Sequence, residues 1–392
     1  MKSCMARQPA MCGTKNPEMK YSPLAAFSHR IELGQPLPFD VHHPDRTVLL
    51  ARGQVIHTQE QLTVLQERGA VVNTGELNGR RPGARATTSN AAPVLWNVCM
   101  ERVDRALRLA TPDDFLDTLD DAIRPVLGLI ERDPDLAIFQ VLREGSAGQV
   151  HYGVAHSLHA AITSHLVATR LGWSADDTLC VFKAALTMNI SMLDLQQRLA
   201  TQMSPPTSSQ REAIEAHPLR SVAMLENAGV TDGPWLDAVA QHHEQPDGSG
   251  YPRRLQRVCE FAELVRRADV YTARLSARAS RGALSADDAV REMFKRDAGH
   301  PMAAALAKEF GVYPPGCYVA LASGETGVVI KRGDNLAKPV VAVMVSARGE
   351  PVTESVRRDS AQPEYAIVSV VGEKNVRVRV PKEALLAQAS GA

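Results

Sequence analysis

The stretch HHEQPDGSGYP, at residues 242–252, brings together two adjacent histidines, two carboxylates and a Gly-Ser-Gly-Tyr-Pro turn. Adjacent histidines can both reach one metal ion where the backbone bends, and glycine lets the chain turn sharply beside such a site. A polar loop without a ligand is the alternative interpretation. We favour a metal- or ligand-binding site, because so many ligand-type and turn residues occur in so short a run.

The same stretch resembles the HHExxDGxGYP signature of the HD-GYP family, whose active members hydrolyse the bacterial second messenger cyclic di-GMP. The resemblance implies an all-α HD-type helical bundle with histidines lining its centre. It also implies metal ligands within the signature and on either side of it. The positions that match them in this sequence are His156, His217, His242, His243 and Asp269.

The His-Asp pair that defines the family is missing. In the family the pair ends an apolar helix that reads like AALLHDIGK, whereas residues 184–192 read AALTMNISM. Met188 therefore stands at the histidine position, Asn189 at the aspartate position and Met192 at the lysine position. The family often has an acid four residues before its first histidine, and this chain has Tyr152 there. No catalytic residue of the pair is intact.

Loss of the pair has a chemical consequence. In the family the aspartate bridges two metal ions, and a neutral amide bridges two cations poorly, while a thioether is a soft donor. We therefore expect the two-metal centre not to assemble. Asp194 is the one nearby carboxylate in 184–196, but it lies five residues after Asn189 and so beyond the site.

A reduced site remains available. Three imidazoles, from His217, His242 and His243, can hold one divalent ion such as iron, manganese or zinc. His156 and Asp269 would then form an incomplete second site. The sequence predicts a mononuclear or empty pocket.

The residues that would hold a nucleotide are better preserved. Arg278 and Arg281 match two basic positions of a family stretch like DALTSDRPYR, and the resemblance implies that they contact phosphate. Their spacing puts both guanidinium groups on one helical face, which suits forked recognition of phosphate oxygens. The remaining predicted ligand-binding residues, all in the signature, are Asp247, Gly250, Tyr251 and Pro252.

Composition excludes several classes of protein. The 392 residues carry 44 Lys and Arg against 44 Asp and Glu, and 44% are hydrophobic, which is ordinary for a soluble globular protein. No apolar run approaches the ~20 residues that span a bilayer, and the first residues lack the apolar core of a secretion signal. The six cysteines are scattered, as in reduced proteins. We expect a cytoplasmic protein without nucleic-acid or membrane partners, and homodimerisation stays open.

Periodicity predicts a multidomain, mainly α chain, with a helix at about 59–69 that has Thr58 as N-cap and Gln61 completing a capping box. A polar, Gly- and Pro-bearing stretch indicates a linker, and the C-terminal part alternates with period two. The five predicted segments are residues 1–26 (disordered N-terminus), 27–75 (small α+β accessory module), 76–92 (linker), 93–312 (helical HD-GYP-like domain) and 313–392 (β-rich C-terminal extension).

Three functions are compatible with these residues. The first is a pseudoenzyme that binds cyclic di-GMP or a related nucleotide as a receptor or regulator. The second is a residual metal-dependent cyclic di-GMP phosphodiesterase that uses a rearranged ligand set. The third is a scaffold that docks a diguanylate cyclase or other signalling protein through the Gly-Tyr-Pro loop, as is described for the family. The missing bridging aspartate favours the first.

Overall fold

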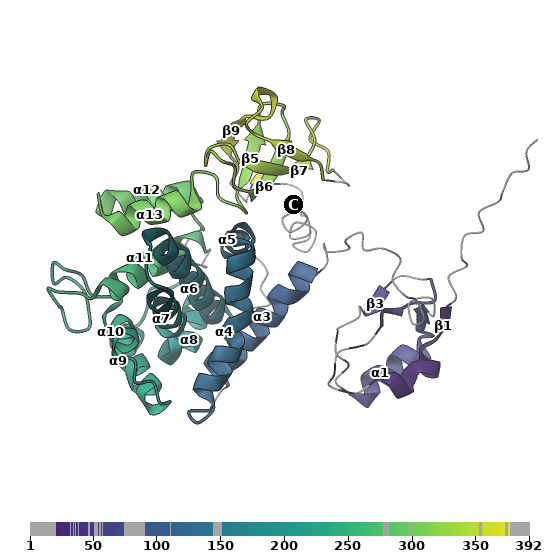
Figure 1. Ribbon diagram of the computed structural model, residues 1–392, viewed down its shortest axis with the longest axis horizontal. Helices are drawn as coiled ribbons and strands as arrows, with labels where there is room; N and C mark the ends of the chain where they lie inside the picture. The colour runs from purple at the N-terminus through teal and green to yellow at the C-terminus, as the bar shows by residue number, and fades with distance from the viewer. Residues whose placement is uncertain are drawn as a thin grey trace, which may run out of the picture. The chain divides into compact units, whose positions relative to one another are not determined.

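The chain folds into two compact units, Met1–Ala86 and Thr87–Ala392, which are described separately (Figure 1). The computed structural model describes residues 21–31, 33, 35, 37, 39–45, 48–50, 54, 56, 58–73, 91–109, 111–143, 151–276, 279, 282–297, 299–352, 355–372 and 375–376.

Among its described residues, the N-terminal unit is an antiparallel sheet with one α-helix. Its strands β1 (Tyr21–Pro23), β2 (Val41–His42), β3 (Val48–Leu50) and β4 (Val71–Asn73) lie in the order β1-β4-β2-β3. The 3-10 helix η1 (Leu24–Arg30) follows β1, and α1 (Gln59–Glu67) precedes β4. A small core of its own, which includes Leu24, Phe39, Val41, Ile56 and Leu62, holds the unit together.

Helix α1 confirms the predicted capping box. Thr58 Oγ1 accepts a hydrogen bond from the Gln61 amide at 3.2 Å, and Gln61 Oε1 accepts one from the Thr58 amide at 3.4 Å. These bonds satisfy two of the donors that a helix start leaves free.

The prediction of disorder through residue 26 is wrong for residues 21–26. Strand β1 pairs with β4, with Tyr21 opposite Asn73, and Leu24 is fully buried. Local sequence gave no signal because the strand partner lies about fifty residues away in the chain. Residues 1–20 and most of the predicted linker lie outside the described residues, and α3 begins at Ala91.

The second unit is an all-α bundle that continues into a β-sheet, which confirms the predicted fold class. Its α-helices are α3 (Ala91–Arg108), α4 (Phe115–Arg132), α5 (Pro134–Arg143), α6 (Tyr152–Leu171), α7 (Ala175–Thr187), α8 (Leu193–Thr201), α9 (Ser208–Asn227), α10 (Gly233–Gln241), α11 (Glu260–Leu275), α12 (Ala286–Arg296) and α13 (Pro301–Phe310), with the 3-10 turn η3 (Ile190–Met192) between α7 and α8.

Helix α6 is the centre of the bundle. It packs against α5, α7, α8, α11 and α13, and it is buried on nearly every side. A helix that is apolar around its whole circumference belongs in an interior. Its buried His156 therefore sits at the centre of the unit.

The C-terminal sheet lies at one end of the bundle (Figure 1). Its antiparallel strands are β5 (Tyr318–Leu321), β6 (Thr326–Lys331), β7 (Val340–Val345), β8 (Arg357–Asp359) and β9 (Ile367–Val370), in the order β8-β7-β6-β5-β9, with the 3-10 turn η4 (Pro363–Tyr365) before β9. Val328, Ile330 and Ala342 belong to the same hydrophobic core as the helices. The sheet and the bundle therefore share one core within this unit.

A network of ion pairs also fastens the sheet to the helices. Arg332, which follows β6, donates from its backbone amide to the Asp135 carboxylate of α5 at 3.1 Å, and its guanidinium pairs with the same carboxylate. It also donates to the side chain of Glu309, on α13, at 2.7 Å. Arg170 of α6 pairs with the other oxygen of that carboxylate. One guanidinium thus connects three elements.

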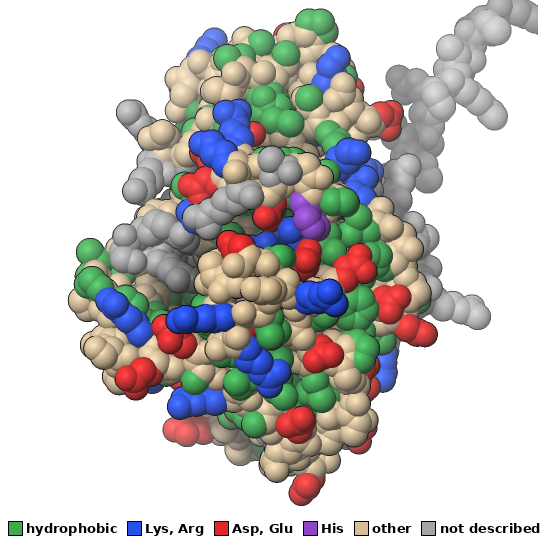
Figure 2. Space-filling view, turned by 90° about the vertical axis from the view of Figure 1, so that its left-hand side faces the viewer, with side chains coloured by type: hydrophobic (Ala, Val, Ile, Leu, Met, Phe, Trp, Pro, Cys, Tyr) green, Lys and Arg blue, Asp and Glu red, His purple; other side chains and the backbone are tan. Residues whose placement is uncertain are grey.

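Two observations bear on the outer surface. On the face seen in Figure 2, basic and acidic side chains are interspersed, in keeping with the zero net charge. The segment Ala175–Thr201 has the length and hydropathy of a bilayer-spanning helix, but 67% of its most apolar window is buried. Burial of this kind is what a core helix of a folded domain shows.

We predict that Arg332→Ala lowers the free energy of unfolding by about 3 kcal/mol, because it leaves a largely buried carboxylate without its partner. Urea denaturation measures the change. Arg124→Ala is the matched control, since Arg124 pairs with Asp121 at side-chain exposures of 77% and 71% and should contribute less than ~1 kcal/mol. Equal losses in the two variants would contradict the prediction.

Candidate metal centre

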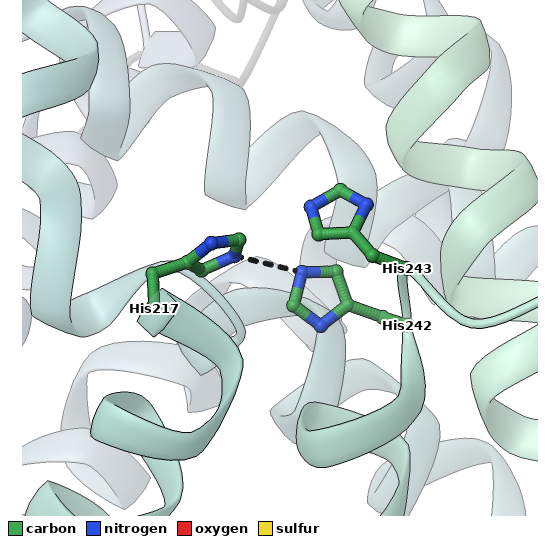
Figure 3. A group of neighbouring side chains, drawn as sticks. All are labelled: His217, His242 and His243. Carbon is green, nitrogen blue, oxygen red and sulfur yellow. Dashed lines mark hydrogen bonds between the residues drawn. The ribbon is translucent and has the colours of Figure 1, made fainter. Parts of the chain in front are cut away.

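Three histidines converge at the centre of the bundle (Figure 3). His217 lies in the middle of α9, His242 caps the C-terminal end of α10, and His243 follows it. One ring nitrogen from each lies within 4.8 Å of the other two. The three predicted ligands of a mononuclear site are therefore brought together, in a geometry that can hold one ion.

Backbone carbonyls fix the direction of two of the rings. His217 Nδ1 lies 2.5 Å from the Ile214 carbonyl oxygen, and His242 Nδ1 lies 2.7 Å from that of Val239. A carbonyl only accepts, so each Nδ1 must carry the proton and each Nε2 has a free lone pair. Metal-binding histidines typically donate their second nitrogen to a carbonyl in this way.

The two Nε2 atoms then face each other at 3.1 Å (Figure 3). Two lone pairs at that separation repel unless a proton or a metal ion lies between them. Burial, together with the nearby His242, lowers the pKa of His217 to about 3. Burial also lowers the pKa of His242 and that of His243. Neutral imidazoles are the metal-binding form, so a metal ion suits this contact better than a proton does.

His156 and Asp269 form a pair beside the triad. His156 Nε2, on α6, lies 2.7 Å from Asp269 Oδ1, on α11. Burial alone would raise the pKa of the Asp269 carboxyl, but the hydrogen bond from His156 and the neighbouring imidazoles outweigh burial and lower this pKa. Asp269 is therefore an ionised carboxylate beside the triad, and its charge favours a cation there.

One cavity of about 230 Å³ connects the pair with the triad. His156, His217, His243 and Asp269 all line it, and His242 lies fully buried behind them. Among the described residues no Lys or Arg lines this cavity. Its remaining lining residues are Tyr152, Asn189, Met192, Gln196, Leu199, Ile214, Tyr251 and Ala273.

The residues that stand in place of the His-Asp pair and the following lysine lie in different environments. Met188 is fully buried and belongs to the hydrophobic core, whereas Asn189 and Met192 line the cavity. The adjacent Thr187 is held by a hydrogen bond from the indole Nε1 of Trp235 at 2.8 Å. Asp194 does not replace the absent carboxylate, because it is 72% exposed and pairs with His151.

The Gly-Tyr-Pro loop folds back onto the histidines. A side chain at Gly250 would approach the backbone of residues 243–245 to about 2.5 Å, so only glycine fits there. The Tyr251 amide donates to the His243 carbonyl at 3.2 Å, and the Tyr251 ring stacks on His243 at 4.6 Å. Gly250 therefore allows the close approach that places Tyr251 against the site.

Glu244 is a residue whose role the sequence did not reveal. Its side chain is almost fully buried, and its carboxylate accepts hydrogen bonds from the amides of Arg253 at 2.6 Å and Leu255 at 2.9 Å. Two oxygens of one buried carboxylate thus fix the segment after Tyr251. The position of Glu244 directly after the histidine pair could have indicated a role at the site. The sequence alone does not distinguish a carboxylate that binds a metal or ligand from one that holds a loop by hydrogen bonds.

Two of the other predicted ligand-binding residues, Asp247 and Pro252, do not line the cavity. Asp247 is exposed, and its carboxylate accepts hydrogen bonds from the Ser249 amide at 2.9 Å and hydroxyl at 2.6 Å. These bonds lower the pKa of Asp247. Pro252 is half-buried next to Tyr251. The predicted phosphate contacts, Arg278 and Arg281, lie outside the described residues.

The part of the chain that forms this site is similar to known proteins. Residues 150–300 match the HD domain family, and this range contains the five predicted metal ligands and the HHExxDGxGYP stretch. Residues 150–300 therefore form an HD domain of the HD-GYP type. The helical unit is accordingly called the HD-GYP domain below.

Two curated proteins resemble the HD-GYP domain. Cyclic di-GMP phosphodiesterase PA4108 of Pseudomonas aeruginosa is 30% identical over 180 residues, which cover 44% of this chain and 43% of that protein. The 3'3'-cGAMP-specific phosphodiesterase 3 of Vibrio cholerae is 26% identical over 145 residues, which cover 36% of this chain and 31% of that protein. The chain thus matches less than half the length of either relative.

A solved structure is also similar. Bd1817, described as an HDG"Y"P protein from Bdellovibrio bacteriovorus, aligns with a TM-score of 0.47 and 14% identity over 74% of this chain and 99% of that chain.

We predict that the purified protein binds at most one divalent ion per chain and that His242→Ala abolishes this binding. His156→Ala should leave the ion count unchanged, because His156 contacts Asp269 and not the triad. Elemental analysis of the three proteins measures the stoichiometry. Two or three ions in the parent protein would show that a multinuclear centre assembles.

Proposed function

We propose that this chain is a non-catalytic cytoplasmic receptor or regulator that binds cyclic di-GMP or a related cyclic dinucleotide at the cavity of its HD-GYP domain. The relatives, by their names, act on cyclic di-GMP and on 3'3'-cGAMP, which are both cyclic dinucleotides. The observation that carries the non-catalytic part is the replacement of the His-Asp pair by a core methionine and a cavity asparagine.

The physical reason concerns the bridging ligand. Two cations ~3.5–4 Å apart repel strongly, and hydrolases of this kind place a carboxylate between them. At this position the cavity offers the neutral amide of Asn189. With Met188 in the core, neither residue of the motif supplies a charged ligand. Hydroxide formation between two ions is therefore disfavoured.

Binding makes smaller demands than catalysis does. A single ion on the triad would supply a Lewis-acidic contact for a phosphodiester oxygen. Tyr152 and Tyr251 line the same cavity, and their rings offer apolar faces to a base or sugar. The volume of about 230 Å³ is below the ~300–1,000 Å³ of a typical ligand pocket. Only one phosphodiester and its surroundings would enter, with the rest of the ligand outside.

We predict that cyclic di-GMP and 3'3'-cGAMP are hydrolysed far more slowly than about 1 per second, which is the lower end of ordinary enzyme turnover. Chromatography after incubation with iron, manganese or zinc separates the dinucleotide from its linear product. Turnover at about 1 per second or faster would instead support the phosphodiesterase alternative. That alternative has one observation in its favour, since His156 and Asp269 share the cavity with the triad.

The double variant Met188→His, Asn189→Asp tests the reason for the missing activity. It restores an imidazole and a carboxylate at the motif, so its metal content should rise above that of the parent. Asn189→Asp alone is the matched control, because it adds the carboxylate to the cavity and leaves the core methionine in place. An unchanged metal content in the double variant would show that another feature prevents assembly.

We predict that the parent protein binds cyclic di-GMP and that the Arg278→Ala, Arg281→Ala double variant binds it at least tenfold more weakly. Charge-assisted hydrogen bonds contribute about 1.5–3 kcal/mol each, and ~1.4 kcal/mol is a tenfold change. Calorimetric titration measures both affinities. Arg291→Ala is a control, since Arg291 is exposed and pairs with Asp287.

The absence of heat with the parent protein at high micromolar ligand would overturn the receptor proposal and favour the scaffold alternative. A feature of the loop supports that alternative too. Arg253, Arg254 and Arg257 are exposed directly after the Gly-Tyr-Pro turn, where an acidic partner could reach them.

A further inference from the structure

Pro218 lies inside α9, directly after His217. In an α-helix the amide of each residue donates to the carbonyl four positions earlier, and proline has no amide hydrogen. The carbonyl that Pro218 leaves without its helical donor is therefore that of Ile214. This is the carbonyl whose oxygen lies 2.5 Å from His217 Nδ1.

We propose that Pro218 is a positioning residue of the metal centre, which reserves the Ile214 carbonyl for His217 Nδ1–H and so directs the His217 Nε2 lone pair into the site. The proposal rests on the metal site considered above. In this proposal Pro218 contacts neither the metal ion nor the ligand. It acts on the site only by favouring one tautomer of His217.

The comparison with His242 explains why a proline is needed. His242 also donates Nδ1–H to a carbonyl three residues earlier, that of Val239, at 2.7 Å. Helix α10 ends at Gln241, so the carbonyls of its last turn have no helical donor and are free to accept. His217 lies in the middle of a longer helix, Ser208–Asn227, where carbonyls are normally occupied. The proline in the middle of α9 therefore gives His217 a carbonyl without a helical donor, as the end of α10 does for His242.

Burial makes the reserved carbonyl necessary. His217 is 1% exposed and Pro218 is buried, so solvent has little access to Nδ1. A buried ring nitrogen that donates to nothing costs free energy, and the alternative tautomer would place a proton on Nε2, 3.1 Å from the Nε2 of His242. That proton would occupy the position where an ion has to bind.

Contacts around the same helical turn hold the ring in place. Ser191, in η3, donates its hydroxyl to the His217 carbonyl at 3.0 Å and lies 2.9 Å from the Ser221 hydroxyl. The segment after Asn189 is thereby tied to α9 next to the proline. The ring of His217 is thus fixed through its own carbonyl and through Nδ1.

The test is Pro218→Ala in the full-length, metal-free protein. Alanine restores an amide that competes with the imidazole for the Ile214 carbonyl. Nitrogen-15 correlation spectra of labelled histidine report which ring nitrogen carries the proton. We expect a single Nδ1–H tautomer for His217 in the parent and a mixture of tautomers in the variant. Zinc affinity, measured by competition with a chelator, should fall about tenfold.

Pro125→Ala is the matched control. Pro125 also lies inside a helix, α4, where it is half-buried. The carbonyl four residues earlier belongs to Asp121, and this helix contains no histidine. Pro125→Ala should change the stability of its helix as Pro218→Ala does, but it should leave the His217 spectrum and the zinc affinity unaltered. A change of the same size in this control would overturn the proposal.

A second variant separates the missing amide from the shape of the proline ring. The α-hydroxy analogue of alanine at position 218 has an ester oxygen in place of the N–H, and it should retain the parent tautomer. The proposal is overturned if Pro218→Ala keeps a pure Nδ1–H tautomer. Failure of the metal proposal would look different, since the parent would then bind no zinc while the tautomer still responded to Pro218→Ala.

Discussion

The site depends on one contact, in which nitrogens of two buried imidazoles face each other at 3.1 Å. Each imidazole has its other nitrogen committed to a backbone carbonyl, so neither ring can turn to relieve the contact without leaving a buried donor unpaired. The same burial keeps the rings neutral. The interior therefore presents lone pairs that a cation satisfies, and the carboxylate of Asp269 adds negative charge nearby.

The Gly-Tyr-Pro loop follows from the same construction. Glu244 is buried beside the histidine pair and accepts the amides of Arg253 and Leu255, so the chain must return over the site. Gly250 permits that return, because any larger residue would collide with the backbone. The outcome is a tyrosine ring stacked on His243. A loop fixed in this way can contribute to recognition even if the adjacent centre performs no chemistry.

The histidine triad and the Gly-Tyr-Pro loop keep their arrangement although the His-Asp pair is missing. Met188 packs in the core and Trp235 holds the preceding threonine, so the end of α7 is stabilised by apolar packing and a hydrogen bond. Asn189 remains at the cavity wall. The end of α7 is thus held in place by protein contacts alone, so the cavity beside it can be kept for a ligand, and this supports the receptor proposal.

The sequence by itself determined the family, the helical architecture and the members of the histidine triad, because a fixed motif and helical periodicity are local properties of the chain. It also predicted the capping box at Thr58, in which both partners lie within one helical turn. It was wrong about residues 21–26, because the strand that pairs with residues 21–23 lies far away in the chain.

Only the tertiary structure decided which neighbours in sequence face the cavity. Met188 and Asn189 are adjacent, yet one lies in the core and the other at the cavity wall. It also separated Asp247, which stabilises its own loop, from Glu244, which clamps the returning chain. The orientation of His217 and His242 came from carbonyls set free by a proline and by a helix end. Such assignments depend on where buried polar groups find partners, and the packing of the whole bundle fixes those partners.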